Sequence, residues 1–553
     1  MDRTVIDYKR GNFCGGQPLR ELAFYAATLF VAYLLFLTIK PLYYVVYEGF
    51  IAQISAAVIL LAIGVYAFSL FKKDELSADK AVILLIAAGT VLRLAYMLYT
   101  PAAVRQHDTY TKSITGHEAY AYTVFSTGKL PETNDYQFYH PPLNAFLQAC
   151  LMHFTDWLAG GLDKLFGLNG VIPQGYLAGK PSYTEEYRYF LYTSCQCQAV
   201  LYSVVTAVTL VKLIKLFGAE GKTFVALSAF VVFFPRHIQF SAQLNNDALS
   251  YMFAALALYF AAKWWKNGRK FTDIMLCSLA VGLGMSAKLS SATVCAPIAV
   301  IFIYEFCCSA FRVDGAEKLS KIIVLYACFL LVCAPIGLWF QFYAKAKFGQ
   351  SFGFVFSNLN RKLYTGDKPF FGRFFIAFDL REYFGWLWCE PFDGQYNLFN
   401  YSLRSALFGE FAYGDLEHIV RLVIICTFAI AALLTAFVAA LTIFSCEVSS
   451  VVLKIKNKEK YNDDDFKLSV FTVALTLSQV LSEIYFYIQM PYGCTMDFRY
   501  IMPLIPAIAL SFMLFGKRLR TCGIRSIEKL YSVAKFTSFA SVAFTTIFYL
   551  VCI

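Results

Sequence analysis

Charged residues are scarce in this chain of 553 residues: they make up 15% of the sequence, whereas hydrophobic residues make up 59%. With a mean hydropathy of +0.56, this composition excludes an ordinary soluble globular domain, and we expect no nucleic-acid partner. The net charge of +11 would indicate a polyanionic partner in a soluble protein. Here the apolar residues gather in runs long enough to cross a bilayer, so we predict an all-α polytopic membrane protein.

Metal-binding and disulfide patterns are also missing. No Cys-x-x-Cys pair or His/Cys cluster at zinc-ligand spacing occurs, so we predict no metal ligands. Most of the 16 cysteines fall in apolar runs, where cysteine behaves as a small hydrophobic residue. Those in polar segments, Cys150, Cys389 and Cys494, are too scattered for a disulfide framework. The first apolar run is longer than a signal-peptide core and more runs follow it, which predicts an uncleaved anchor.

About thirteen runs have the length and hydropathy of a transmembrane helix. The short polar segments on one side of these runs, such as that from Lys454 to Lys467, are densely basic. The positive-inside rule therefore places the N-terminus in the cytoplasm and the C-terminus outside, and it turns the long loops 101–186 and 344–417 outward. The predicted spans are 22–40, 51–71, 81–100, 188–212, 222–235, 246–265, 271–287, 290–307, 321–343, 419–445, 468–489, 500–515 and 533–553.

The loop 101–186 carries the most informative polar residues. It opens with the segment Arg105–Asp108, immediately after a predicted span. A short helix is expected from Gly116, ended by Gly128 and Pro131. The pair Pro141-Pro142 can begin another helix, because a first turn does not need the amide donor that proline lacks. Apolar residues then recur at helical spacing from Leu143 to Leu158, which predicts a helix lying on the membrane surface.

The order of these pieces resembles that of the C-type (GT-C) membrane glycosyltransferases. A span ending in an acid is followed by the helix ending in the segment 126–131 and by the segment Tyr139–Leu143. Later matches are Asn245–Leu249, Gly282–Ser290 and Arg499–Leu504, each at the end of a span. The resemblance is greatest to the family-39-like branch of protein O-mannosyltransferases and aminoarabinose transferases. It covers roughly residues 85–515 and leaves the first two spans outside the usual pattern.

The resemblance implies a GT-C-like bundle with outward juxtamembrane helices. It divides the chain into two additional N-terminal helices (1–80), a catalytic transmembrane core (81–343), an outward aromatic-rich loop (344–417) and C-terminal transmembrane helices (418–553). It also implies an inverting transfer of a hexose or pentose from a polyprenyl-phosphate donor to a glycan, lipid or protein acceptor at the outer or lumenal membrane face. No cofactor is required by the sequence, and a divalent cation is left open.

Such a transfer needs a base for the acceptor, cations or donors for the phosphate, and an apolar groove for the lipid. We predict Asp108 as the base, because its position at a span end desolvates part of the carboxylate. The resemblance implies Glu118 as a second acid that orients the acceptor or the base. The alternative for Asp108 is a solvated loop acid that merely follows a helix.

For the donor phosphate we predict ligands at span ends, where arginine can contact two oxygens and lysine acts as a point charge. The same basic residues could instead anchor the helices at the bilayer interface. The segment 245–247 could equally be a helix cap. The predicted phosphate ligands are His140, Arg236, Lys288, Arg499 and Tyr500, and the predicted acceptor-side or supporting residues are His107, Asn245 and Asp247.

Several features leave alternatives open. The aminoarabinose branch has a lysine where this chain has His140, which argues against transferring its amino-sugar specificity. The aromatic segment 384–388 could bind sugar or lie at the bilayer interface. Asn400-Tyr401-Ser402 is a glycosylation sequon in a eukaryotic secretory setting, and Asp463–Asp465 reads as a solvated loop. A lipid or solute transporter is the alternative function, although no internal repeat is visible. The membrane would be the plasma membrane in a bacterium and the endoplasmic reticulum in a eukaryote.

Overall fold

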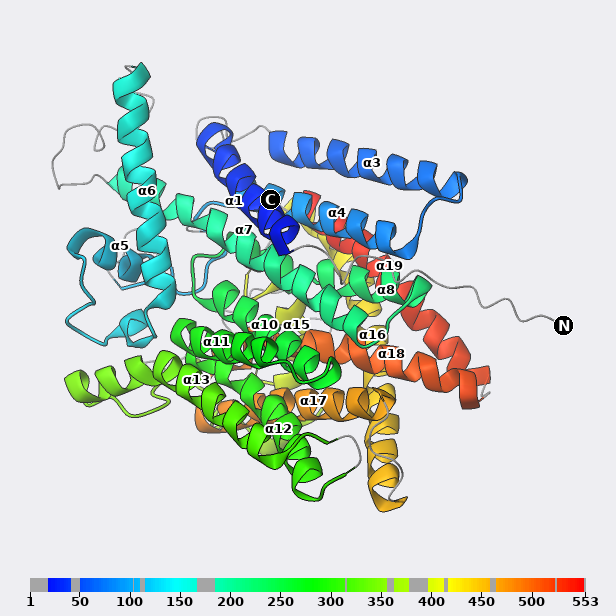
Figure 1. The fold of residues 1–553 in the computed structure, drawn as a ribbon. Coiled ribbons are helices and arrows are strands. Elements are labelled where there is room, and N and C mark those ends of the chain that lie inside the picture. Colours follow the sequence, from blue (N-terminus) through cyan, green and yellow to red (C-terminus); the bar gives the residue numbers. More distant parts are fainter. Residues whose placement is uncertain are drawn as a thin grey trace.

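The structure is a computed structural model, and it describes residues 18–40, 50–102, 104–109, 115–166, 185–313, 316–355, 363–376, 396–411, 416–457, 464–522 and 525–551. Among these residues no β-strand forms, and a single bridge joins Tyr364 to Tyr492. The helices pack into one bundle in which most axes run alongside one another (Figure 1). The prediction of an all-α polytopic membrane protein is confirmed.

Each predicted span corresponds to a helix of the described chain. Within the described residues, nine helices are long and apolar enough to cross a membrane, and the number rises to eleven if each of two bent pairs forms one span. The helices are α1 (Pro18–Thr38), α3 (Ile51–Lys72), α4 (Ala78–Tyr99), α7 (Glu185–Leu216), α8 (Gly221–Val232), α10 (Asp247–Lys266), α11 (Phe271–Ala287), α12 (Cys295–Ala310), α13 (Leu319–Phe348), α16 (Leu416–Asn457), α17 (Asp464–Gln489), α18 (Leu504–Cys522) and α19 (Arg525–Val551).

Two of the spans are broken near the same end of the bundle. Helix α8 is followed by α9 (Pro235–Gln239) and the 3-10 turn η2 (Phe240–Ala242), with a bend of 49°. The turns η7 (Gly493–Met496) and η8 (Phe498–Ile501) precede α18 with a bend of 54°. Prolines at 235 and 503 lie at these breaks, where a residue without an amide donor interrupts the hydrogen-bond ladder of a helix. At these breaks, polar backbone groups and polar side chains face the interior of the bundle.

The loop after α4 folds as predicted. Helix α5 (His117–Thr127) ends at Gly128, which adopts the left-handed conformation (φ +66°) that ends many helices. After the turn η1 (Tyr136–Tyr139), helix α6 (Leu143–Phe166) starts directly behind the two prolines. The end of the bundle at which α4 stops and α5 lies is called the α5 end below.

Helix α6 lies across the direction of the spans and projects beyond them (Figure 1). Asn144 and Gln148 point inward, and both donate to the carbonyl of Leu244, at 3.3 and 2.6 Å. Met152 is also on the inner side and is 1% exposed, whereas Phe154 and Trp157 are 46% and 70% exposed. Large exposed apolar side chains are expected of a helix whose outer face meets lipid.

Helices α11 and α13 approach each other closely through small residues. A Cβ atom on Gly282 would lie 2.9 Å from the Cβ of Ile336, and one on Gly337 would lie 3.1 Å from that of Met285. Ser286 also donates to the carbonyl of Ile336. Small residues allow such backbone contact between helices in membranes. The end of α11, which carries Lys288, is therefore held against α13.

Arg93 joins four helices inside the bundle. Its side chain is 1% exposed, and it donates to Ser203 of α7 at 2.7 Å and to the carbonyls of Gly89 and Val232 at 2.9 Å. Nη2, which donates to Val232, also lies 3.2 Å from Nδ1 of His237 in α9. The guanidinium thus satisfies acceptors that the broken α8 span would otherwise leave without donors.

Replacing Arg93 with Leu should lower the free energy of unfolding by roughly 2–4 kcal/mol, because several buried acceptors lose a charged donor. Thermal unfolding of the purified chain in lipid nanodiscs would measure the change. Arg421→Leu is the matched control, since this arginine lies in α16 with an exposed side chain. Equal stability of the two variants would contradict the structural role of Arg93.

Candidate functional site

The α5 end of the bundle gathers polar residues from seven segments of the chain. They come from the loop after α4, the start of α5, the end of η1, α9, the start of α10, the end of α11 and the turn η8. All the predicted site residues are among the described residues, namely His107, Asp108, Glu118, His140, Arg236, Asn245, Asp247, Lys288, Arg499 and Tyr500. The broken spans and the helix ends therefore build one polar region.

Asp108 is the accessible acid of this region. Its side chain is 38% exposed, whereas Glu118 is 1% and Asp247 is 1% exposed. The backbone of Asp108 is left-handed (φ +53°), as is that of Arg105 (φ +55°). Such conformations are uncommon in residues with a Cβ atom and cluster at functional sites. The carbonyl of Asp108 also accepts the amide of His117 at 2.9 Å, which ties the loop to the start of α5.

Two cations lie against one aromatic ring near Asp108. Nη1 of Arg499 is 3.9 Å from the Asp108 carboxylate. The guanidinium carbon of Arg499 is 5.0 Å from the ring centroid of Tyr500, and Nζ of Lys288 is 5.2 Å from the same centroid. Nη2 of Arg499 donates to the Tyr500 hydroxyl at 2.9 Å. The Nε of Arg499 meets no acceptor among the described residues.

Lys288 is held by the start of α10. Its Nζ pairs with Oδ1 of Asp247 at 2.5 Å, and the neighbouring Asn246 donates to the carbonyl of Ala287 at 3.0 Å. Asn245 precedes the N-cap residue Asn246, and its Oδ1 accepts the amide of Asp247, the first residue of α10, at 3.1 Å. Asp247 thus holds Lys288, and Asn245 satisfies a free amide at the helix start.

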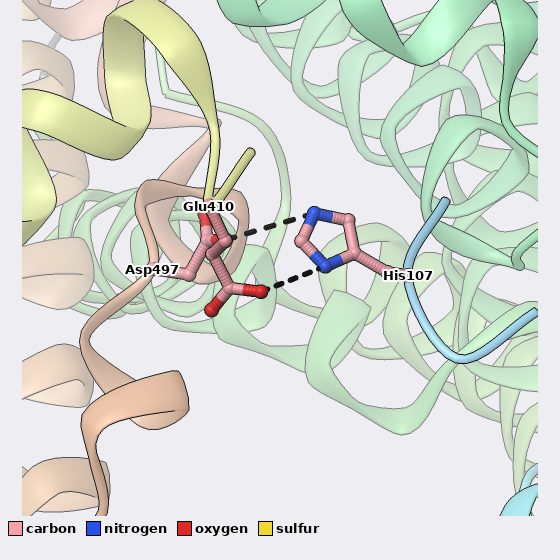
Figure 2. A group of neighbouring side chains, drawn as sticks. All are labelled: His107, Glu410 and Asp497. Carbon is pink, nitrogen blue, oxygen red and sulfur yellow. Dashed lines mark ion pairs between the residues drawn. The ribbon is translucent and has the colours of Figure 1, made fainter. Parts of the chain in front are cut away.

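Behind Asp108 lies a fully buried network of four side chains, three of which are shown in Figure 2. Arg236 donates to both carboxylate oxygens of Asp497 at 2.8 and 2.7 Å. The same nitrogen is 2.8 Å from Nε2 of His107, and Nδ1 of His107 is 2.9 Å from the Glu410 carboxylate. Since Arg236 can only donate, Nε2 of His107 accepts and Nδ1 donates its proton to Glu410. The network therefore fixes one neutral tautomer of His107.

His107, Glu410 and Asp497 form a group that could hold a metal ion by composition and spacing. Arg236, however, already brings a positive charge within hydrogen-bond distance of His107 and Asp497. A metal ion at that point would have to displace the guanidinium and then tolerate its charge nearby. These residues are therefore better suited to contact with the buried arginine than to binding a metal ion.

Glu410 and Asp497 were not predicted from the sequence. Asp497 comes two residues before Arg499 and caps η8 by accepting the amide of Arg499 at 2.9 Å. Glu410 also accepts the hydroxyl of Tyr401 at 2.6 Å. Gly409 has φ +64°, and a Cβ atom there would lie 2.0 Å from Nη1 of Arg236, so only glycine fits beside the arginine. An acid next to a span end was the available signal for Asp497.

Arg236, predicted as a phosphate ligand, is 0% exposed and is bonded to Asp497 and Gln239. The structure thus places it behind the other cations. Glu118 lies in the first turn of α5. His140 lies at the end of η1, with its ring 5.4 Å from that of His117.

Burial keeps the histidines of this region neutral. It lowers the pKa of His117 to about 4, and burial, together with the nearby His117 and the charge of Lys288, lowers the pKa of His140 well below its usual range. Burial, followed by the charges of Arg499 and Arg236, lowers the pKa of His107 in the same way. All three imidazoles therefore contribute hydrogen bonds and no positive charge near neutral pH.

The outward loop 344–417 is described only in part. The aromatic segment 384–388, Cys389 and Asp463 lie outside the described residues. The sequon residue Asn400 is 3% exposed inside helix α15 (Leu398–Phe408), so the folded chain does not present it for glycosylation. The end of α15 leads directly to Glu410 and thereby connects this loop with His107.

No curated protein is similar enough to the chain to be matched. A family model does match residues 192–339, from within α7 to within α13. The matched segment contains Arg236, Asp247 and Lys288, but neither Asp108 nor Arg499. This match is to the dolichyl-phosphate-mannose-protein mannosyltransferase family; it confirms the resemblance to C-type membrane glycosyltransferases and supports a glycosyltransferase with a dolichyl-phosphate-linked sugar donor.

Proposed function

We propose that the protein is an inverting glycosyltransferase that moves a sugar from a dolichyl-phosphate or related polyprenyl-phosphate donor to an acceptor at the outer or lumenal membrane face. One observation carries the proposal: the exposed carboxylate of Asp108 lies 3.9 Å from Arg499, and Arg499 and Lys288 share the ring of Tyr500. A base beside two cations at a membrane boundary suits the attack of a hydroxyl on a lipid-linked glycosyl phosphate.

In this mechanism Asp108 takes the proton from the nucleophile of the acceptor. The nucleophile then forms a bond to the anomeric carbon from the face opposite the phosphate, and the bond between that carbon and the phosphate oxygen breaks. The electron pair leaves with the polyprenyl phosphate, whose charge grows as the bond breaks. Arg499 and Lys288 stabilise that charge, with the Tyr500 hydroxyl and a neutral His140 as further donors.

The buried network positions the base. His107 is fixed between Glu410 and Arg236, and it immediately precedes Asp108 in the chain. We assign Arg236 to this supporting role and to no direct phosphate contact, because its side chain is 0% exposed and its two terminal nitrogens are engaged by Asp497, His107 and Gln239. We assign Glu118, in the first turn of α5, to orienting the acceptor or the base.

The α5 end is proposed to face outward, with the N-terminus in the cytoplasm. This follows from the basic segments on the opposite side of the spans. The family match supports a hexose such as mannose as the sugar of the donor. The acceptor is a protein, lipid or glycan nucleophile.

Replacing Asp108 with Asn should reduce sugar transfer at least about 100-fold, because the amide cannot accept the proton of the acceptor. Radioactive mannose moved from dolichyl-phosphate-mannose into the protein, lipid or glycan fraction of membranes would measure transfer. Asp135→Asn is the control, since Asp135 is an exposed acid in the same loop. Normal transfer by Asp108→Asn would refute the base, and a transporter would move sugar lipid without forming a glycoside.

Replacing Lys288 with Met should lower kcat/KM for the donor about 10–100-fold, since a charged hydrogen bond to the phosphate is lost. The same assay with a series of donor concentrations gives the value. Lys345→Met serves as the control, because Lys345 is an exposed lysine near the same end of the neighbouring helix α13. Similar kcat/KM values for both variants would remove Lys288 from the phosphate site.

The depressed histidine pKa values predict how transfer depends on pH. If a charged His140 held the phosphate, kcat/KM would fall as the pH rises through about 6.5, where imidazolium is ordinarily lost. Because the folded-state pKa is lowered, the imidazole is already neutral there, and no such fall should occur between about pH 6 and 8. A falling limb near 6.5 that disappears in His140→Gln would show that the charged form acts.

A further inference from the structure

The start of α10 contains buried acceptor atoms that the protein leaves without donors. Asp247 uses Oδ1 for Lys288, but its Oδ2 meets no donor among the described residues. Asn246 donates through its amide nitrogen to Ala287, and its Oδ1 is also without a donor there. The two residues are 1% and 2% exposed.

Buried acceptors without donors are unfavourable, at about 1–3 kcal/mol for each group. Most buried polar atoms in proteins are therefore paired, and an exception calls for an explanation such as a ligand. The preceding residue, Asn245, shows that the local backbone does not prevent a side chain from finding hydrogen-bond partners. Asn245 uses both ends of its amide, accepting from the Asp247 amide and donating to Gln243 at 2.9 Å.

The surroundings of these acceptors indicate the chemistry of the missing ligand. Lys288 touches Asp247 directly, and the charge of Arg499 also acts on the Asp247 carboxylate. A ligand in this place would thus meet cations on one side and hydrogen-bond acceptors on the other. A glycosyl phosphate has the complementary groups, since its phosphate accepts hydrogen bonds and its ring hydroxyls donate them. A phosphodiester without a sugar would satisfy the cations and leave the acceptors unpaired.

We infer that Asn246 and Asp247 form the subsite for the sugar ring of the donor, with Asn246 Oδ1 and Asp247 Oδ2 accepting its hydroxyl groups. This inference rests on the proposed function and adds the residues that distinguish a glycosylated lipid phosphate from a bare one. Asp247 then has two roles, because it orients Lys288 toward the phosphate through Oδ1 and meets the sugar through Oδ2. Discrimination arises because a donor lacking hydroxyls leaves these buried atoms unsatisfied.

The test compares two ligands of equal charge, dolichyl-phosphate-mannose and dolichyl methyl phosphate, which carries no sugar hydroxyls. Binding of each to the full chain in lipid nanodiscs would be measured by calorimetry. The wild type should bind the mannosylated lipid about tenfold more tightly. Asn246→Ala should lose most of that preference and keep its affinity for dolichyl methyl phosphate. Asn267→Ala, at the exposed opposite end of the same helix, should keep both affinities.

The remaining outcomes separate this inference from the proposed function. If the wild type binds both lipids equally, the sugar subsite is wrong while phosphate recognition stands. If Asn246→Ala keeps the preference, or loses both affinities to the same extent, Asn246 has no role in sugar recognition and the inference is overturned. If the wild type binds neither lipid, the proposed function itself fails.

Discussion

The ion pair between Arg236 and Asp497 is the constraint on which the site depends. The two residues are 0% exposed and come from broken spans that are 261 positions apart in the sequence. Burial of two charges costs free energy that only close, saturated contacts offset, and loss of one partner would leave the other charged and buried. His107 and Glu410 join the same pair, so the loop after α4, the end of α15 and η8 are fixed relative to one another.

Much of the fold could be predicted from the sequence because hydropathy is a local property. Each apolar run became a helix, Gly128 ended α5, and the prolines before Leu143 began α6. The accessible acid Asp108 and the basic residues Arg499 and Lys288 could likewise be located, since each lies where an apolar run ends. The sharp bends at Pro235 and Pro503 were beyond prediction, because the carbonyls freed there are satisfied by residues such as Arg93, which lies on a different helix.

The composition of the site was harder to predict than its location. Arg236 and Arg499 look alike in sequence, as basic residues at broken spans, but Arg236 meets Asp497 and is buried behind Arg499. Which of the two arginines approaches Asp108 depends on partners hundreds of residues away, and no local pattern contains that information. Glu410 was not predicted for the same reason. It is an acid in an aromatic loop, and it joins the site through its contact with His107. Asn246 likewise resembles an ordinary helix cap until its neighbours are known.

The close contact of α11 with α13 has a consequence for how the two sides of the site can move. Gly282 and Gly337 leave no room between the helices, so Lys288 extends from a helix end that is packed tightly against α13. The loop of Asp108 is also held in place, through the network around His107 and the hydrogen bond from His117 to the Asp108 carbonyl. Neither side should then move far during a reaction cycle, and in the proposed function the helix end that carries Lys288 would keep the lipid phosphate at one depth in the membrane.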